Sequence, residues 1–452
     1  MATTKITNRL IAGYGVGDFA MNLYWSGTAF FLLYWYTDVA GLPNEVAGFL
    51  FFIGSAWDAV TDPAMGIIAE RTRTQWGRYR PYILLGSIPL AASFVLLLWV
   101  PPLEGMALTG MLIFAHLLFR TMYTVVGVPY SALSARLTHN SQDRTKLSGV
   151  RMIAASSGGL AISAAAFPMV HWLGDGNEAS GFFQLGILAG LLAIAVHVVC
   201  FLNTTEPDLG EQGEAEPVVG LKDIAAMVKA NTPFVLIFFS VLLFSSAAVL
   251  MGKNTLYIVK YALEAHDRQH IVVLTTGITS LCMIPIWTWI AHRIGKRKTW
   301  LIATAIGASG LLALYGVGIT TFERFVVHMF VIQLGMSAFG MLFWSMLPDT
   351  VEYGQWKTGI RSEAIVFGFT TFAQKVSIGI AGWILGFLLT WTGYESNATQ
   401  SQETLDGILM IMTLIPTALI LLASTLVWRY PIETELHDEI VRAIDAGEVA
   451  KS

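Results

Sequence analysis

Apolar runs of about twenty residues recur from one end of this 452-residue chain to the other. A helix needs about twenty mostly apolar residues to cross the hydrocarbon core of a bilayer, where its backbone hydrogen bonds must be satisfied internally. Hydrophobic residues make up 55% of the chain and charged residues only 13%, about half the share usual in a soluble domain. The sequence therefore predicts an all-α integral membrane protein whose surface faces a lipid bilayer.

Twelve transmembrane helices are expected, and an even number places both termini on the same side of the membrane. The apolar spans lie near residues 10–36, 45–69, 82–100, 107–135, 147–170, 182–202, 233–261, 271–291, 299–318, 325–347, 364–391 and 407–429. Loops on the terminal side contain Lys or Arg, namely 70–80, 135–146, 292–298 and 354–361, whereas most loops on the other side contain none. The positive-inside rule then predicts a multi-pass protein of the cell (inner) membrane with both termini cytoplasmic.

The longest polar interruption, at 203–223, divides the spans six plus six. We expect an N-terminal six-helix bundle (1–202), a cytoplasmic linker (203–231), a C-terminal six-helix bundle (232–430) and a cytoplasmic tail (431–452). The two halves have weakly similar sequences at one position, since "AERTRTQWGRYRPYILLG" follows the second span and "AHRIGKRKTWLIATAIG" follows the eighth. Two parallel six-span repeats are typical of the major facilitator fold.

Two carboxylates stand four residues apart in the second span, at Asp58 and Asp62. Residues at i and i+4 share one face of a helix, so the two acids point the same way. An ionised carboxylate at the centre of a span costs ~2.5–3.5 kcal/mol. A polar cavity, a bound cation or a proton would lower this cost, and each of these indicates an ion-coupled site. The alternative is a pair that only reaches the cytoplasmic interface, because Pro63 and a basic loop follow.

Other polar residues inside the spans should face the same space. Asp18 shares a helix face with Asn22 and Trp25 in the first span. The remaining candidates are Arg120, Tyr123 and Thr124 in the fourth span, Arg151 at the start of the fifth span and Lys375 in the eleventh span. We expect these acids and bases to neutralise one another around one central space. Arg151 is also consistent with a simple cytoplasmic interface residue.

The stretches "WDAVTDPAMGIIAERTRTQWGRYRP" (57–81), "YTVVGVPYSAL" (123–133) and "DTVEYGQWKTGIRSEAI" (349–365) resemble the glycoside–pentoside–hexuronide:cation symporters, which include the melibiose and glucuronide carriers of the major facilitator superfamily. The resemblance runs over nearly the whole chain. It implies a secondary active transporter that works by alternating access, with a glycoside and a coupling cation as partners and no cofactor.

The resemblance also implies roles for individual residues. The cation site would comprise Asp58, Asp62 and Thr124, linked to the sugar site by Lys375. The sugar site would comprise Asp18, Tyr123, Arg151, Trp344, Thr371 and Lys375. To these the residues themselves add Asn22 and Trp25, on the helix face of Asp18, and Arg120 of the fourth span. A charged cytoplasmic gate would comprise Arg144, Arg293, Asp349, Glu352 and Arg361. From the residues alone, these five charged side chains are equally consistent with a gate and with an exposed charged loop.

Two departures from the melibiose carriers bear on the coupling ion. Gly127 stands where they have an Asp, and Gly17 stands where they have a Lys. Loss of a carboxylate weakens a sodium site, which needs several oxygen ligands, whereas a proton needs only one carboxylate. The sequence therefore favours H⁺ over Na⁺ at Asp58 and Asp62.

Arg120 is an addition to the pattern of the melibiose carriers. A second arginine near Arg151 would suit an anionic sugar, such as a uronide or a sulfonated sugar. The alternative is that Arg120 pairs with Asp18 or Asp58 and touches no substrate.

Other functions remain open at this point. An uncoupled facilitator or a lipid carrier would use the same fold. A prenyl-transfer enzyme would hold Mg²⁺-diphosphate between two facing Asp-rich motifs, and because this chain has one Asp pair we expect no enzyme. The two cysteines lie in apolar spans, so no metal cluster or disulfide framework is indicated. We expect a monomer with no nucleic-acid partner.

Overall fold

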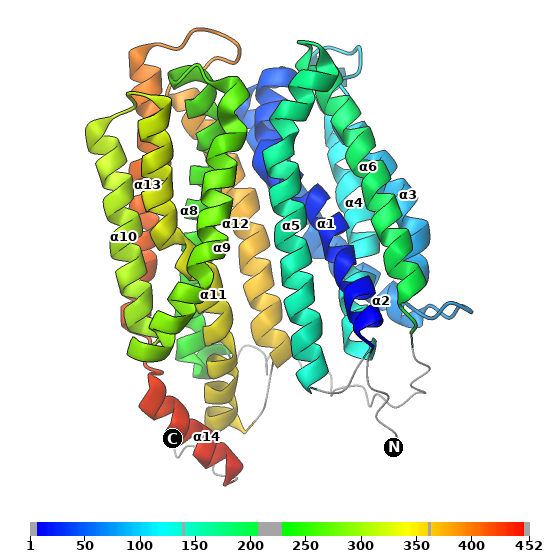
Figure 1. Cartoon of the computed structure of the whole chain (residues 1–452), viewed down its shortest axis with the longest axis vertical. Helices are drawn as coiled ribbons and strands as arrows, with labels where there is room; N and C mark the ends of the chain where they lie inside the picture. Colours follow the sequence, from blue (N-terminus) through cyan, green and yellow to red (C-terminus); the bar gives the residue numbers. More distant parts are fainter. Residues whose placement is uncertain (1–6, 138–140, 207–227, 360–362, 447–452) are drawn as a thin grey trace. The chain divides into compact units, whose positions relative to one another are not determined.

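The computed structural model describes residues 7–137, 141–206, 228–359 and 363–446, with the side chains of 135–136, 141–145, 148, 363–365, 434 and 445 excepted. Within these ranges the regular elements are all helices, apart from one isolated bridge between Thr74 and Gly77. The chain divides into two compact units (Figure 1). Unit 1 holds α1 to α6, and unit 2 holds α8 to α14 except for the start of α9.

Unit 1 consists of six long helices. They are α1 (Asn8–Tyr34, continued by the π-helix η1, Trp35–Val39), α2 (Asn44–Arg71), α3 (Arg80–Leu97), α4 (Gly105–Leu137), α5 (Ser141–Gly174) and α6 (Glu178–Asn203).

Unit 2 contains six further long helices and one short one. They are α8 (Thr232–Tyr257, continued by the π-helix η2, Ile258–Ala262), α9 (Gln269–Ile294, preceded by η3, His266–Arg268), α10 (Lys296–Val317), α11 (Phe322–Thr358), α12 (Glu363–Trp391), α13 (Gln402–Trp428) and the short α14 (Thr434–Asp445).

Twelve of these helices are long enough to cross a bilayer. Ten of them, α3 to α6 and α8 to α13, are also strongly apolar over the described residues. The other two, α1 and α2, have 27 and 28 residues and carry the polar side chains of Asp18, Asn22, Asp58 and Asp62. The predicted fold class, an all-α membrane protein with twelve transmembrane helices in two six-helix bundles, is confirmed.

The two units repeat one packing scheme. In unit 1, α1 packs against α5 and α6, while α3 packs against α4 and α6. The helices at the same positions of unit 2 do the same, since α8 packs against α12 and α13 and α10 packs against α11 and α13. The weak similarity between the halves of the sequence therefore has a counterpart in the way each bundle is assembled.

Three predicted loop or tail segments contain more helix than expected. The tenth span continues as α11 to Thr358, so half of the predicted loop 354–361 is helical. Gly359, with φ of 74°, then ends α11 in the left-handed conformation. Similarly, α5 begins at Ser141 inside the predicted loop 135–146, and α14 forms within the predicted tail. Hydropathy marks only the part of a helix inside the bilayer, so polar extensions are not visible to it.

Glycines allow two of the closest helix contacts. A Cβ on Gly158 of α5 would collide with the backbone carbonyl of Phe19 in α1, and a Cβ on Gly335 of α11 would collide with the backbone of α10 at Gly307. Membrane helices lack a hydrophobic force that pulls them together, so small residues that allow close backbone contact stabilise their packing. Gly158 thus sets how closely α1 approaches α5.

We expect Gly158→Ala to lower the thermal stability of the purified protein in detergent by about 1–3 kcal/mol, because the added methyl forces α1 and α5 apart. The matched control is Gly110→Ala in α4, where a Cβ would meet no atom within 4 Å. There the higher helix propensity of Ala should give a gain of about 0.5–1 kcal/mol. Equal melting temperatures for the two variants would contradict the proposed contact.

Candidate functional site

Polar side chains from four helices of unit 1 converge inside the bundle. Asp18 comes from α1, Asp58 and Asp62 from α2, Tyr123 from α4, and Arg151 from α5. Tyr123 lies within electrostatic range of all three carboxylates. Asp18 and the two acids of α2, which follow it by 40 and 44 residues, are therefore brought into one region of the membrane-spanning part.

Asp58 forms a two-pronged ion pair with Arg120 of α4. Arg120 Nε donates to Asp58 Oδ1 at 3.1 Å, and Arg120 Nη2 donates to Asp58 Oδ2. Both residues are buried, with Asp58 2% and Arg120 8% exposed. Of the two possibilities that the sequence left for Arg120, the structure shows pairing with Asp58. Such a pair satisfies both charges without an external ion, and breaking it would leave an uncompensated buried charge.

Asp62 lies one turn further along α2 and has a different partner. It is half-buried and accepts a hydrogen bond from Thr124 Oγ1 at 2.7 Å. Because α4 runs alongside α2, the four-residue spacing of the two acids is matched by the four-residue spacing of Arg120 and Thr124. The structure thus brings together Asp62 and Thr124, as the sequence predicted, and gives the two acids of the pair unlike surroundings.

Aromatic rings lie beside the Asp58–Arg120 pair. The guanidinium carbon of Arg120 is 5.4 Å from the ring centroid of Trp25, and the rings of Trp25 and Tyr123 are 5.7 Å apart. Asn22, one turn before the tryptophan, donates to the backbone carbonyl of Asp18 at 3.0 Å. Trp25, Asn22 and Tyr123 are each only partly buried, so their faces and polar groups are accessible.

Asp18 pairs with Arg151 of α5. The hydroxyl of Tyr130 also donates to Asp18 Oδ2 at 3.2 Å. Tyr130 stacks on Tyr14 at 4.7 Å between ring centroids, and each hydroxyl donates to the backbone carbonyl of the other residue, at 2.7 and 2.8 Å. The Arg151 guanidinium carbon lies 5.2 Å from the Tyr130 ring centroid. Arg151 is therefore an internal partner of Asp18 rather than a simple interface residue.

Tyr130 and Tyr14 were not identified from the sequence. The sequence did offer one indication of Tyr130, because this residue follows Pro129 within 123–133, one of the three stretches that carry the family resemblance. Gly17 gives a second signal, since a Cβ there would collide with the Tyr130 ring. The glycine that replaces the lysine of the melibiose carriers thus makes room for this tyrosine.

Three further candidates lie in unit 2. Trp344 of α11 is 40% exposed and stacks on Phe367 at 6.0 Å between ring centroids. Thr371 of α12 donates to the carbonyl of Phe367, and Lys375 follows one turn later, half-buried. The link between Lys375 and the acids of unit 1 stays a prediction.

The acids assigned to the gate have partners within unit 2. Lys296 Nζ donates to both carboxylate oxygens of Asp349, at 2.9 and 2.7 Å. His437 of α14 is 2.7 Å from Glu352 and 3.7 Å from Asp349. Neither Lys296 nor His437 was singled out from the sequence, and α14, which carries His437, was not predicted.

The arginines assigned to the gate are placed less completely. The Arg293 guanidinium carbon lies 5.0 Å from the ring centroid of Trp289. The side chain of Arg144 and the whole of Arg361 lie outside the described residues. Their pairing with Asp349 and Glu352 stays a prediction.

Known proteins match this chain along most of its length. Residues 13–434 match the family described as MFS/sugar transport protein. The isoprimeverose transporter of Lactiplantibacillus pentosus is 32% identical over 411 residues, covering 89% of this chain and 84% of that protein. The glucuronide carrier protein homolog of Escherichia coli (strain K12) is 28% identical over 445 residues, covering 98% of this chain and 96% of that protein.

A solved structure shares the fold. The crystal structure of the nucleoside transporter NupG has a TM-score of 0.69 at 13% identity and covers 94% of this chain and 100% of that chain. The chain described here is therefore a multi-pass membrane transporter and not an enzyme. It belongs to the MFS/sugar transport protein family, among the glycoside–pentoside–hexuronide:cation symporters of the major facilitator superfamily.

Proposed function

We propose that this protein is a proton-coupled glycoside symporter of the cell inner membrane, with both termini in the cytoplasm. The observation that carries the proposal is the unequal pairing of the α2 acids. Asp58 is matched by the guanidinium of Arg120, whereas Asp62 has a neutral hydroxyl from Thr124. We assign Asp62, which is half-buried and accepts a hydrogen bond from the uncharged hydroxyl of Thr124, as the carboxylate that takes up the coupling ion.

The charges of unit 1 support this assignment. Asp18 and Asp58 each pair with an arginine of unit 1, Arg151 and Arg120, and Asp62 accepts a hydrogen bond from Thr124. Uptake of a proton by Asp62 removes a charge from the membrane-spanning part, which lowers the cost of burying that side chain. If the neutral site binds sugar more tightly, linkage requires that sugar also raises the affinity for the cation.

The ligands around Asp62 favour a proton over sodium. Thr124 donates a hydrogen bond to its carboxylate, and Gly127, which replaces the second acid of the melibiose carriers, lies beside the side chain of Met21. A hard metal cation needs several oxygen ligands held around it. A proton needs only the carboxylate itself.

The same ion pairs favour a neutral glycoside over an anionic sugar. Arg120 and Arg151 would be the partners of a substrate carboxylate or sulfonate, and both already hold an aspartate. A neutral sugar can use Asp18 and Asn22 for its hydroxyls and the Trp25 ring for its apolar face. One relative is named for isoprimeverose and another for a glucuronide, so the family supplies both kinds of candidate.

The remaining sequence-based assignments are part of this proposal. Transport would proceed by alternating access between bundles 1–202 and 232–430, joined by the linker 203–231, in a monomer. Trp344, Thr371 and Lys375 would complete the sugar site from the C-terminal bundle. Asp349 and Glu352, with Arg144, Arg293 and Arg361, would form the cytoplasmic gate, and the tail 431–452 contributes His437 to those acids.

A second candidate function is an uncoupled facilitator. It is favoured by the Asp58–Arg120 pair, which supplies an internal cation at the place where an external one would otherwise be needed. The two candidates differ in the role of Asp62, and the next experiment separates them.

We expect wild-type protein in liposomes to concentrate its glycoside under an inward proton gradient without Na⁺. One pH unit is worth about 1.4 kcal/mol, or about tenfold accumulation for one proton per sugar. Asp62→Asn should abolish this accumulation but retain counterflow, since the amide keeps the shape of the side chain and cannot carry the proton.

Glu45→Gln, in the first turn of the same helix, is the matched control and should accumulate sugar as wild type does. Accumulation by Asp62→Asn at the wild-type level would refute the coupling role of Asp62. Counterflow without accumulation in the wild type would establish the facilitator, and accumulation that requires Na⁺ would reject the proton.

The role of Arg120 as a fixed counter-ion can be tested by stability. Asp58→Asn leaves Arg120 buried without its charge partner and should destabilise the protein by about 3–5 kcal/mol. The double variant Asp58→Asn with Arg120→Gln removes both charges and should recover much of that loss. Thermal unfolding of the three proteins in detergent measures the effect, and additive losses would show that the two residues do not act as a pair.

Substrate charge can be tested by the thermal shift of purified protein without Na⁺. We expect neutral glycosides to raise the melting temperature more than glucuronides do. The shift should be larger at the lower of two pH values, because the protonated site is the one that binds sugar. A larger shift with glucuronides would show that Arg120 or Arg151 exchanges its aspartate for the substrate.

A further inference from the structure

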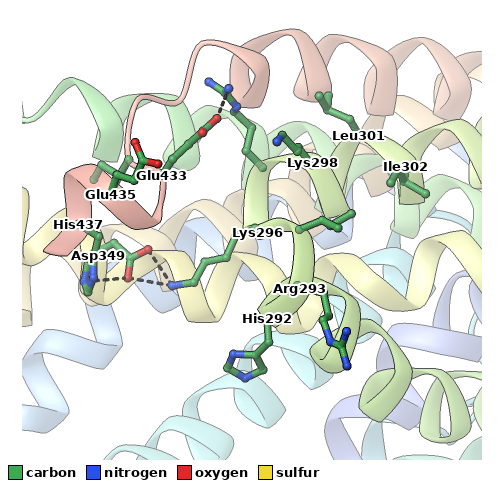
Figure 2. A pocket seen from close by; sticks show the side chains of 15 residues that line it. His292, Arg293, Lys296, Lys298, Leu301, Ile302, Asp349, Glu433, Glu435 and His437 are labelled. Atoms are coloured by element: carbon green, nitrogen blue, oxygen red, sulfur yellow. Dashed lines mark hydrogen bonds and ion pairs between the residues drawn. The ribbon is translucent and has the colours of Figure 1, made fainter.

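A cavity of about 860 Å³, lined by charged and apolar side chains, lies in unit 2 (Figure 2). It is formed where α9 ends and α10 begins, and its other walls come from Asp349 of α11 and the segment that leads into α14. Two of its lining residues, Arg293 and Asp349, belong to the proposed cytoplasmic gate, and the present inference concerns what the cavity between these elements binds.

The charges in the cavity are divided between its walls. Two cations are matched by acids, since Lys296 pairs with Asp349 and Arg297 with Glu433, while Glu435 adds a further acid on the α14 side. Arg293 and Lys298 line the α9–α10 wall, on the other side of Lys296 (Figure 2). Among the residues that the structure describes, neither has a carboxylate within ion-pair distance. The α9–α10 wall is therefore positively charged and open to an anion.

Apolar side chains extend from this wall along the membrane-spanning helices. Ile302 of α10 lines the cavity and is 44% exposed. Trp289 of α9 is 58% exposed, and its ring lies under the Arg293 guanidinium at 5.0 Å. Exposed apolar residues on spanning helices contact lipid, and tryptophan is enriched at the level of the headgroups. The two cations thus lie at the height of the membrane interface.

The corresponding place in unit 1 already holds an anion. The sequence similarity between the halves aligns the start of α3 with the start of α10, and at α3 the carboxylate of Glu206 accepts hydrogen bonds from the backbone amides of Arg78 and Tyr79, at 2.8 and 3.0 Å. At α10 the first turn has no acid and no side-chain cap. In unit 1 a carboxylate caps the backbone amides at this position, whereas in unit 2 the acids Asp349 and Glu433 pair with the side chains of Lys296 and Arg297 and the cavity opens beside them.

We propose that this cavity binds the headgroup of an anionic phospholipid. Arg293 and Lys298 attract the acidic headgroup from the two sides of Lys296 (Figure 2), and the acyl chains lie along the exposed apolar side chains of α9 and α10 around Trp289 and Ile302. Basic pockets at the ends of spanning helices attract acidic headgroups through charge-assisted hydrogen bonds. The apolar rim distinguishes a lipid from free phosphate as the occupant.

The test measures binding of phosphatidylglycerol to the full-length protein in detergent by native mass spectrometry. Arg293→Gln with Lys298→Gln should weaken binding about tenfold or more, since each basic residue contributes to attraction of an acidic headgroup. The control, Arg324→Gln with Arg429→Gln, removes the same number of charges from unit 2 outside the cavity and should bind as wild type does. Equal binding by the two double variants would overturn the proposal.

Two further measurements decide the chemistry. Phosphatidylcholine should bind more weakly than phosphatidylglycerol, and equal binding of the two lipids would overturn the charge-based assignment. Inorganic phosphate should fail to displace the lipid at concentrations equal to that of the lipid, and full displacement would assign the cavity to free phosphate instead. If the double variant does not fold, Lys298→Glu at an exposed position gives the same comparison, and unchanged binding by it would equally refute the site.

Discussion

The buried ion pair between Asp58 and Arg120 determines how the rest of the N-terminal unit works. It joins α2 to α4 inside the membrane, and it sets the register at which Asp62 meets Thr124 one turn further on. A charge pair in this environment stabilises the bundle only while both partners are present. The pair thereby positions Asp62, the carboxylate to which the proposed coupling of sugar to a proton is assigned.

A second ion pair, Asp18 with Arg151, completes the site from α1 and α5. It is supported by two stacked tyrosines whose hydroxyls are bonded to one another's backbone, so the position of Tyr130 near Asp18 is rigidly defined. Both arginines of the site are therefore committed to aspartates. Acids are also paired with basic residues in unit 2, where Asp349 contacts Lys296 and Glu352 contacts His437. The basic residues Arg293 and Lys298, which have no such pair among the described residues, line a separate cavity.

The positions of the spans could be predicted from the sequence because bilayer thickness imposes a length on every apolar run. The shared face of Asp58 and Asp62 followed from helix geometry alone. The partner of Arg120 could not be predicted, since two acids on different helices were equally available and only the packing of α2 on α4 decides between them. Helical segments outside the bilayer, such as the end of α11 and α14, were missed because they leave no hydropathy signal. Tyr130 and His437 were missed for the same kind of reason, since their roles depend on contacts between distant elements.

The polarity of α1 and α2 has a consequence for how the protein is made. Because α1 and α2 precede α4 and α5 in the chain, they carry three carboxylates into the membrane before either arginine partner has been synthesised. An early intermediate that contains only α1 to α3 therefore has acids without counter-charges, and its insertion is expected to be incomplete. Emergence of α4 and α5 would then draw the first helices fully into the lipid, so the N-terminal bundle would mature as a unit and not one hairpin at a time.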